Sequence, residues 1–238
     1  MKVVYMGTPA FSIPPLEHLL AGGYEVVGVY TQPDKPAGRG RGVTASPVKT
    51  FAEGRGLRVF QPRSLRSPAA YQELLELGPD LIVVAAYGRI LPQEVLQLPP
   101  RGCVNIHPSL LPRHRGPSPV VFTILEGDQM AGVTLMVVDE GMDSGPIIAR
   151  EEEPLLPRDT TEALTERLFE KGAELLVRSL PLYVQGDLVP TPQDEAQATY
   201  ARKLTKEDGL LRWELPATTL ERQVRAYSPW PGSYTHWR

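Results

Sequence analysis

Short apolar runs that alternate with helix-like segments are the feature that most constrains the fold of this chain. The runs at 2–7, 24–31 and 80–88 are almost continuously apolar, and a fourth, at 102–104, leads into "NIHPS". Such runs are typical of strands that are buried on both faces of a sheet. Helical segments lie between them, which favours a parallel sheet covered on both sides. We therefore predict an α/β fold with a Rossmann-like, doubly wound, mostly parallel sheet.

Further elements follow from residue pattern and capping signals. Ser46 and Pro47 form an N-cap and first-turn pair, which predicts a helix over 46–56. The longest helical pattern covers 160–186. The other expected strands are 57–60, 131–143 and a more exposed 146–155, and the other expected helices are 7–23 (after a turn), 67–79 and 118–128.

After Gly186 the sequence loses its long apolar periodicity and becomes rich in Pro, Gln and Thr. The 238 residues, 42% of them apolar, suffice for one sizeable α/β domain and a fragment of a second. We expect the main domain at 1–188, a linker rich in Pro, Gln and Thr at 189–206, and the start of a second domain at 207–238. This last segment reads as a short strand, a helix and an aromatic tail, and it is too short for a core of its own.

Cysteine usage and hydropathy limit the cellular setting. The one cysteine, Cys103, excludes a disulfide within the chain, which fits a reducing cytosol. No apolar stretch reaches the roughly 18 residues of a membrane span, and the N-terminus enters a strand rather than a signal peptide. The His and Cys residues lack the spacing of metal ligands, so we expect no metal site. We expect a cytoplasmic protein.

Charge is unevenly distributed along the chain. The net charge of −3 by itself argues against a nucleic-acid-binding protein. However, residues 31–49 carry +3 from four basic and one acidic side chain, and residues 200–238 carry +3 from seven basic and four acidic ones. The remainder therefore sums to −9. An acidic body with two basic segments is more informative than the net charge.

The first strand-to-helix turn, "YMGTPAFS", lacks a nucleotide signature. Only Gly7 is present where a dinucleotide-binding fingerprint needs three glycines, because Pro9 and Ser12 take the other positions. The Gly-rich, basic segment "PAGRGRG" at 36–42 lacks the Gly-Lys-Ser/Thr ending of a P-loop. We expect neither a dinucleotide cofactor nor an ATP site, although a phosphate contact remains open.

Polar residues follow three of the predicted strands. The segment 87–89 follows the first, Asn105 and His107 end the second, and 139–143 follows the third. In doubly wound sheets, ligands bind beyond the carboxyl ends of the strands. If these strands are neighbours, an amide, an imidazole and a carboxylate can converge on one pocket.

This set of groups suits acyl transfer without a covalent enzyme intermediate. Asn105 can donate to a developing oxyanion, and His107 can exchange a proton near neutral pH. Asp143 can orient the imidazole or act as the base itself. Structural alternatives remain: Asn105 could cap a turn, His107 could be a satisfied strand-end histidine, and Asp143 could stabilise its Gly-flanked turn.

The segment "NIHPSLLPRHRG" at 105–116, with "DEGMDSGPI" at 139–147, resembles the folate-dependent formyltransferase family. The resemblance implies an Asn-x-His pair, a Ser-Leu-Leu-Pro turn and a Gly-x-Asp-x-Gly loop at one site. It extends from residue 2 to about residue 233. Further segments are similar to the tRNA-modifying branch of that family, namely 6–12, 31–49, 83–92, 199–213 and 225–233.

The resemblance implies transfer of the formyl group of 10-formyltetrahydrofolate to the α-amino group of methionine on initiator tRNA, for translation initiation. It implies catalytic roles for Asn105, His107 and Asp143, and no metal. The implied folate-binding residues are Tyr87, Gly88, Arg89, Ile90, Leu91, Ser109, Leu110, Leu111, Pro112, Val138, Asp139 and Gly141. The implied tRNA-binding residues are Lys35, Arg39, Arg41, Lys49, Arg202, Lys203 and Lys206, in a 31–49 loop that is partly mobile until tRNA binds and in the linker.

The chain departs from the family pattern in three places. His114 stands where the family usually has an aromatic residue, and "GPSPV" at 116–120 replaces "GAAPI". Only the opening of the family's C-terminal, OB-like β-barrel is present, so we expect catalysis to survive with weaker tRNA binding. We also expect a monomer. Two alternatives stay open: a formyltransferase or hydrolase acting on another amine or on water, and an inactive, truncated folate- or tRNA-binding remnant.

Overall fold

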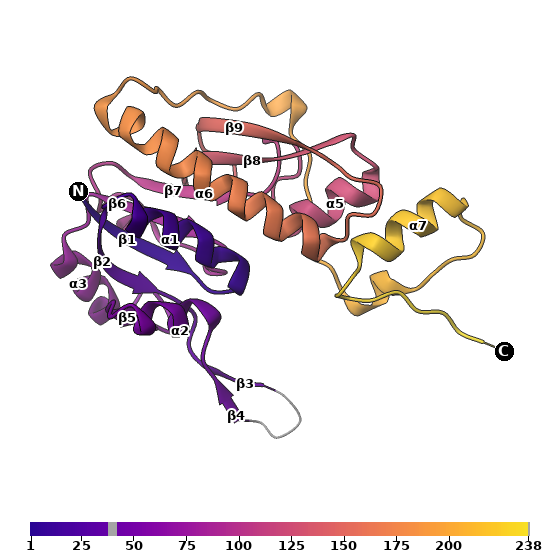
Figure 1. Cartoon of the computed structure of the whole chain (residues 1–238), viewed down its shortest axis with the longest axis horizontal. Helices are drawn as coiled ribbons and strands as arrows, with labels where there is room; N and C mark the ends of the chain where they lie inside the picture. Colours follow the sequence, from indigo (N-terminus) through magenta and orange to yellow (C-terminus); the bar gives the residue numbers. More distant parts are fainter. Residues whose placement is uncertain (38–41, 238) are drawn as a thin grey trace.

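The computed structural model describes residues 1–37 and 42–237. Its centre is a seven-stranded sheet with the order β5-β2-β1-β6-β7-β8-β9 (Figure 1). The five strands from β5 to β7 are parallel, whereas β8 runs antiparallel to both of its neighbours. This confirms the predicted α/β class with a mostly parallel sheet. The strands are β1 (Lys2–Gly7), β2 (Glu25–Tyr30), β5 (Val59–Phe60), β6 (Leu81–Ala85), β7 (Cys103–His107), β8 (Met130–Val137) and β9 (Ile147–Pro154).

Helices cover both faces of the sheet because alternate strand residues are apolar on each side. On one face, Val104 and Ile106 of β7 share a buried cluster with Phe169 and Leu176 of α6. On the other face, Cys103 shares a cluster with residues of α3 and α4. The helices are α1 (Ile13–Ala21), α2 (Pro47–Gly54), α3 (Pro68–Leu77), α4 (Gln93–Leu96), α5 (Pro119–Glu126), α6 (Thr161–Gln185) and α7 (Ala217–Ala226). The one-turn 3-10 helices are η1 (Ala10–Ser12), η2 (Glu195–Gln197) and η3 (Lys206–Gly209).

Helix boundaries follow the capping signals in the sequence. The hydroxyl of Ser46 accepts a hydrogen bond from the Lys49 amide at 3.1 Å, so the predicted N-cap of α2 is confirmed. Thr160 caps α6 in the same way, through the Ala163 amide. Helix α6 ends at Gly186, whose φ of 87° is the left-handed conformation that glycine adopts at low cost. The predicted helix over 160–186 is therefore confirmed.

The C-terminal segment packs on the main domain. Ala226 of α7 shares a buried cluster with Val120 of α5 and Leu168 of α6. In Figure 1, α7 lies beside α5 at the β8–β9 end of the molecule. The C-terminal segment, which is too short for a core of its own, therefore contributes to a core that it shares with α5 and α6. The predicted domain boundaries at 188 and 206 stay predictions.

Three predicted elements differ in the structure. The strand expected over 131–143 ends at Val137, and the rest of that segment is a loop. The expected 31–49 loop contains two short antiparallel strands, β3 (Lys35–Ala37) and β4 (Gly42–Thr44), while residues 38–41 lie outside the described part. The short strand expected before α7 is a single bridge between Leu210 and Tyr234.

The helices were compared with the length and hydropathy that a membrane-spanning helix needs. Within residues 1–37 and 42–237, no helix is both long enough and apolar enough to span a bilayer.

Candidate active site

Strand β7 places Asn105 and His107 on one face of the sheet. Its alternate residues Val104 and Ile106 pack under α6, so Cys103, Asn105 and His107 point to the opposite face. His107 is 4% exposed, and Asn105 is half-buried. The Asn105 carboxamide has no hydrogen-bond partner among the described residues, so its donors are available to a ligand.

The backbone carbonyl of His114 fixes the proton arrangement of His107. This oxygen lies 3.0 Å from His107 Nε2. Since a carbonyl can only accept, Nε2 must carry a hydrogen. In the neutral ring, Nδ1 therefore holds the free lone pair. It lies 3.7 Å from Asp143 Oδ1, beyond hydrogen-bond range but within reach of an ion pair.

Asp143 reaches His107 by a route that the sequence did not predict. Because β8 is antiparallel to β7, its last residue, Val137, pairs with Val104 near the start of β7. The carboxyl end of β8 therefore lies at the opposite edge of the sheet from His107. The loop after Val137 instead returns to the imidazole, and Asp143 adopts a left-handed backbone with φ of 52°. Its Oδ2 accepts a hydrogen bond from the Gly116 amide at 2.8 Å.

The turn after His107 is held by strands β8 and β9. The hydroxyl of Thr134 donates to the Ser109 carbonyl at 2.6 Å and accepts from the Leu111 amide at 3.1 Å. Arg150 donates to the Leu111 carbonyl at 2.8 Å. The Ser109 hydroxyl donates to the carbonyl of Arg113, which makes it a structural group rather than a nucleophile.

His114, whose carbonyl contacts His107, belongs to a network of charged side chains. His114, only 2% exposed and with a φ of 61°, places Nε2 2.7 Å from Asp128 Oδ2. Arg113 forms ion pairs with both Asp128 and Glu126. Burial opposes ionisation of Asp128, but the hydrogen bonds from His114 and Arg113 outweigh it and lower the pKa of Asp128 to about 2. Sequence reasoning missed both acids, although a histidine inside "RHR" signals a nearby carboxylate.

Asp128→Asn is expected to lower the free energy of unfolding at pH 7 by about 2 kcal/mol. The pKa of Asp128 falls from 3.8 to about 2 on folding. This stabilisation is therefore present above pH 4 and is lost as the pH falls toward 2. Urea denaturation at several pH values measures it, with the exposed Asp187→Asn as control. A stability difference that stays constant from pH 7 to pH 3 would contradict the pairing.

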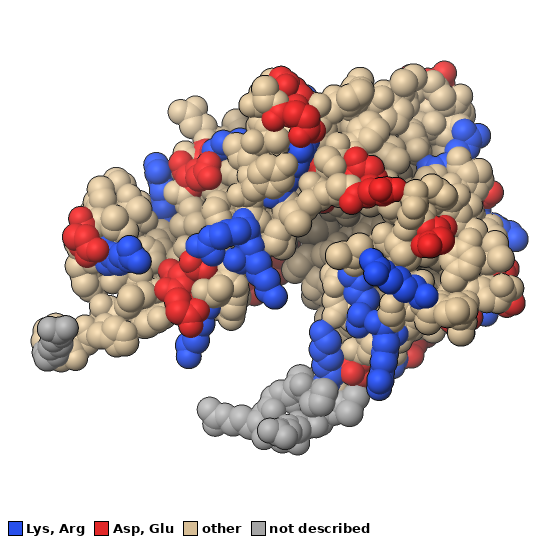
Figure 2. All heavy atoms as spheres, turned by 180° about the vertical axis from the view of Figure 1, so that it is seen from behind, with Lys and Arg blue, Asp and Glu red and all other residues tan. Residues whose placement is uncertain are grey.

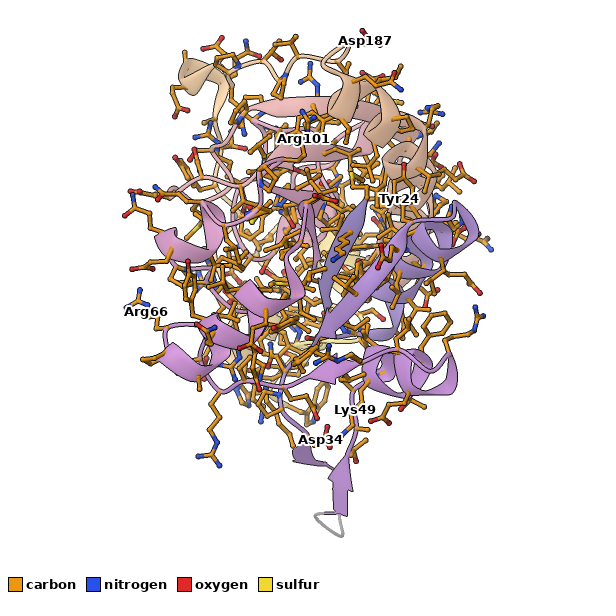
Figure 3. The ribbon with its side chains drawn as sticks, turned by 90° about the vertical axis from the view of Figure 1, so that its left-hand side faces the viewer. Tyr24, Asp34, Lys49, Arg66, Arg101 and Asp187 are labelled. Atoms are coloured by element: carbon orange, nitrogen blue, oxygen red, sulfur yellow. The ribbon has the colours of Figure 1, made fainter. Side chains whose placement is uncertain are left out.

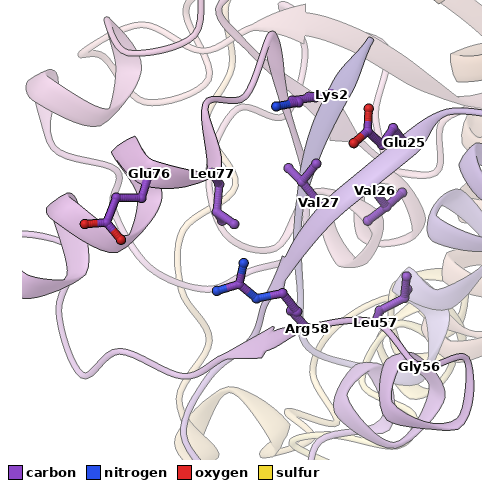
Figure 4. Close-up of a pocket in the computed structure, with 9 residues that line it drawn as sticks. All are labelled: Lys2, Glu25, Val26, Val27, Gly56, Leu57, Arg58, Glu76 and Leu77. Carbon is purple, nitrogen blue, oxygen red and sulfur yellow. The ribbon is translucent and has the colours of Figure 1, made fainter.

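The pocket in Figure 4 lies at the edge of the sheet where the parallel strands begin, away from His107. It is lined by Lys2 and Glu25, which begin β1 and β2, and by residues of α3. His107 ends β7, which runs parallel to β1 through β6. The pocket and the imidazole therefore lie at opposite edges, and the polar groups around His107 remain the candidate site.

Comparison with known proteins decides the family. A family model for "Formyl transferase" matches residues 1–180, and one for "Formyl transferase, C-terminal domain" matches residues 203–238. A methionyl-tRNA formyltransferase from Roseiflexus sp. (strain RS-1) is 54% identical and aligns with 100% of this chain and 74% of its own length. One from Chloroflexus aurantiacus is 51% identical, with 100% and 77% coverage.

The chain belongs to the methionyl-tRNA formyltransferase family. Solved structures at lower identity share its fold. A 4-N formyltransferase from Francisella tularensis has a TM-score of 0.77 at 18% identity, covering 98% of this chain and 91% of that one. HypX from Aquifex aeolicus, in complex with tetrahydrofolic acid, has a TM-score of 0.70 at 22% identity, covering 99% and 36%. These likenesses support the fold alone.

In this member of the methionyl-tRNA formyltransferase family, the residues predicted to bind folate lie in three segments, which follow β6, β7 and β8. After β6, Gln32 donates to the Tyr87 carbonyl at 3.0 Å, while Ile90 is 84% exposed. In the turn after β7, the Leu111 side chain is buried in the protein. In the loop after β8, Asp139 accepts hydrogen bonds from the Gly141 amide and the Ser144 hydroxyl. Folate contacts at these residues stay a prediction.

The residues predicted to bind tRNA differ in how far they are engaged within the protein. Lys49 pairs with Asp34 at 2.6 Å at the base of the β3–β4 hairpin, which Figure 3 shows, and this contact lowers the pKa of Asp34. Arg202 pairs with Asp208. Arg39 and Arg41 lie outside the described residues. The remaining three are Lys35, which donates to Gln32, and the exposed Lys203 and Lys206.

Proposed function

We propose that this chain transfers the formyl group of 10-formyltetrahydrofolate to the α-amino group of methionine on initiator methionyl-tRNA. The observation that carries the proposal is the imidazole of His107, held between the His114 carbonyl and Asp143, with Asn105 on the same strand face. Neither Ser109 nor Cys103, the nearest such residues along the described part of β7 and its turn, is suited as a nucleophile: the Ser109 hydroxyl donates to the Arg113 carbonyl, and burial raises the pKa of Cys103 to about 12. Direct attack by the acceptor amine is the chemistry that fits.

The mechanism follows from the groups present. The amine attacks the formyl carbon, a carbon–nitrogen bond forms, and the carbonyl electrons move to oxygen. The carboxamide of Asn105 donates to this oxyanion. The lone pair at His107 Nδ1 takes a proton from the amine, and Asp143 stabilises the imidazolium. When the bond to folate nitrogen breaks, that nitrogen gains a proton and the formyl group stays on methionine.

Charge supports a nucleic acid as the acceptor. Figure 2 shows a hollow on one face between the C-terminal segment and the side that carries the hairpin, with Lys and Arg side chains on both of its sides. Phosphate neutralisation by such side chains is the usual source of affinity for RNA. A cytoplasmic monomer fits this role.

Lys203→Gln and Lys206→Gln are expected to raise KM for methionyl-tRNA several-fold and leave kcat and folate binding unchanged. Each loses a cation near phosphates, so the salt dependence of tRNA binding becomes shallower by up to about 0.9 in log–log slope per contact. The matched control is Lys2→Gln, an exposed lysine at the opposite edge of the sheet. An equal effect of the control would contradict a local role.

Competition between acceptors tests the function against its nearest alternative. Initiator methionyl-tRNA, a nucleotide-linked amino sugar and water are offered with 10-formyltetrahydrofolate at the same concentration of the chain. We expect the tRNA to be formylated with the highest kcat/KM. Preferential formylation of the amino sugar, or hydrolysis without transfer, would overturn the proposed acceptor.

A further inference from the structure

The segment 189–206, predicted to be a linker, crosses the candidate active site. The Thr191 amide and carbonyl exchange hydrogen bonds with Ile147 at 2.9 and 2.8 Å. Further along, the Arg115 amide donates to the Thr199 carbonyl at 2.8 Å, and the Ala201 amide donates to the Arg115 carbonyl at 2.7 Å. The segment is therefore attached to the start of β9, directly after the loop that carries Asp143, and to the turn that follows His107.

Gln193 lies between these two attachment points and joins the loops through its side chain. Its Nε2 donates to the carbonyls of Asp143 at 2.9 Å and Gly145 at 2.7 Å. Its Oε1 accepts from Nε of Arg115 at 3.0 Å. A guanidinium can only donate and carbonyls can only accept, so these partners permit one orientation of the carboxamide. Both of its hydrogens are used at the Asp143 loop.

The Arg115 guanidinium, which donates to Gln193, is itself held firmly in place. Its side chain is 1% exposed, and a buried charge of this kind needs full pairing. The Glu195 carboxylate receives two hydrogen bonds from it, at 2.7 and 2.8 Å, which hold the pKa of Arg115 above its usual value. Gln193 takes the remaining Nε hydrogen. Nη1 also donates to the Tyr200 hydroxyl at 3.5 Å, so three residues of the segment 189–206 hold the guanidinium.

We propose that Gln193 is a positioning residue for Asp143, with Arg115 and Glu195 holding its carboxamide in place. Asp143 has a left-handed backbone, with a φ of 52°, which non-glycine residues rarely adopt and which persists only when the surroundings hold it. The Gly116 amide holds its carboxylate, and Gln193 holds its carbonyl. The segment is therefore part of the catalytic site, an inference that rests on the proposed function for its kinetic consequence.

The test compares Gln193→Met with Gln197→Met, since Gln197 is an exposed glutamine of the same segment. Hydrogen exchange at the Gly116 amide reports on the Asp143 carboxylate and needs no substrate. We expect faster exchange of this amide only in Gln193→Met. We also expect kcat to fall by between about 10-fold and 100-fold, with folate affinity unchanged. The Gln197 variant should match the unmodified chain.

A second variant guards against a folding defect. Gln193→Glu keeps an acceptor for Arg115 but replaces the donation to the two carbonyls with a carboxylate oxygen that repels them, so it should show at least the same losses, and thermal unfolding shows that it is folded. In an Asp143→Asn background, either substitution should cost little further activity, because the two residues act as a unit. Unchanged Gly116 exchange, or full additivity, would overturn the proposal. If the unmodified chain formylates no tRNA, the proposed function fails, while the exchange experiment still decides the role of Gln193.

Discussion

His107→Ala is expected to lower the single-turnover rate of formyl transfer by between about 100-fold and 10,000-fold, with little change in folate affinity. General acid–base catalysis contributes effects of this size. The geometry gives the reason: Nε2 is committed to the His114 carbonyl, so only Nδ1 can exchange a proton with the reacting amine. The substitution removes that lone pair and leaves Asp143 without its partner.

A matched control separates this effect from a general loss of structure. His236 is exposed in the C-terminal tail, and His236→Ala should leave the transfer rate unchanged. Thermal unfolding of both variants shows whether the fold is intact. A His107→Ala protein that folds normally and retains near-full rate would contradict the assigned role of the imidazole.

Asn105→Ala is expected to cost between about 100-fold and 1,000-fold in the rate of transfer, the usual cost of removing one oxyanion donor. Asn105 is the only asparagine in the chain, and its carboxamide is free of partners among the described residues. The isosteric Asn105→Asp should lose as much, because its carboxylate repels an oxyanion and cannot donate to it.

The Asn105→Ala substitution is expected to lower kcat and to leave the affinity for the formyl donor unchanged. An oxyanion forms only after attack, so the affinity for an unreactive folate analogue should stay the same. Gln72→Glu, an exposed carboxamide on α3, is the control and should have the activity of the unmodified chain. A loss of folate affinity that accounts for the whole rate effect would contradict an oxyanion role.

The sequence predicted those parts of the fold that local signals determine. Strand β1 was expected over 2–7 and the structure places it at Lys2–Gly7. The Ser46 cap and the long helix α6 were found because capping and 3.6-residue periodicity are local properties. The convergence of His107 with Asp143 was expected from polar residues at the ends of neighbouring strands and from the family resemblance, and the two side chains do lie 3.7 Å apart.

What the sequence could not predict depends on contacts between distant segments. The antiparallel direction of β8 is set by pairing with β7 and β9, and a buried strand looks alike in either direction. The segment around Gln193 lacks apolar periodicity, so it was interpreted as a linker, yet its polar side chains are what attach it to the site. The pair of His114 and Asp128 is likewise visible only after folding.

The most direct measurement is single-turnover formylation of initiator methionyl-tRNA by this 238-residue chain with 10-formyltetrahydrofolate. Elongator methionyl-tRNA and free methionine are the controls. The account predicts transfer to the initiator that is faster than to either control and that is lost in His107→Ala. Binding of the folate without any transfer to methionyl-tRNA would contradict it.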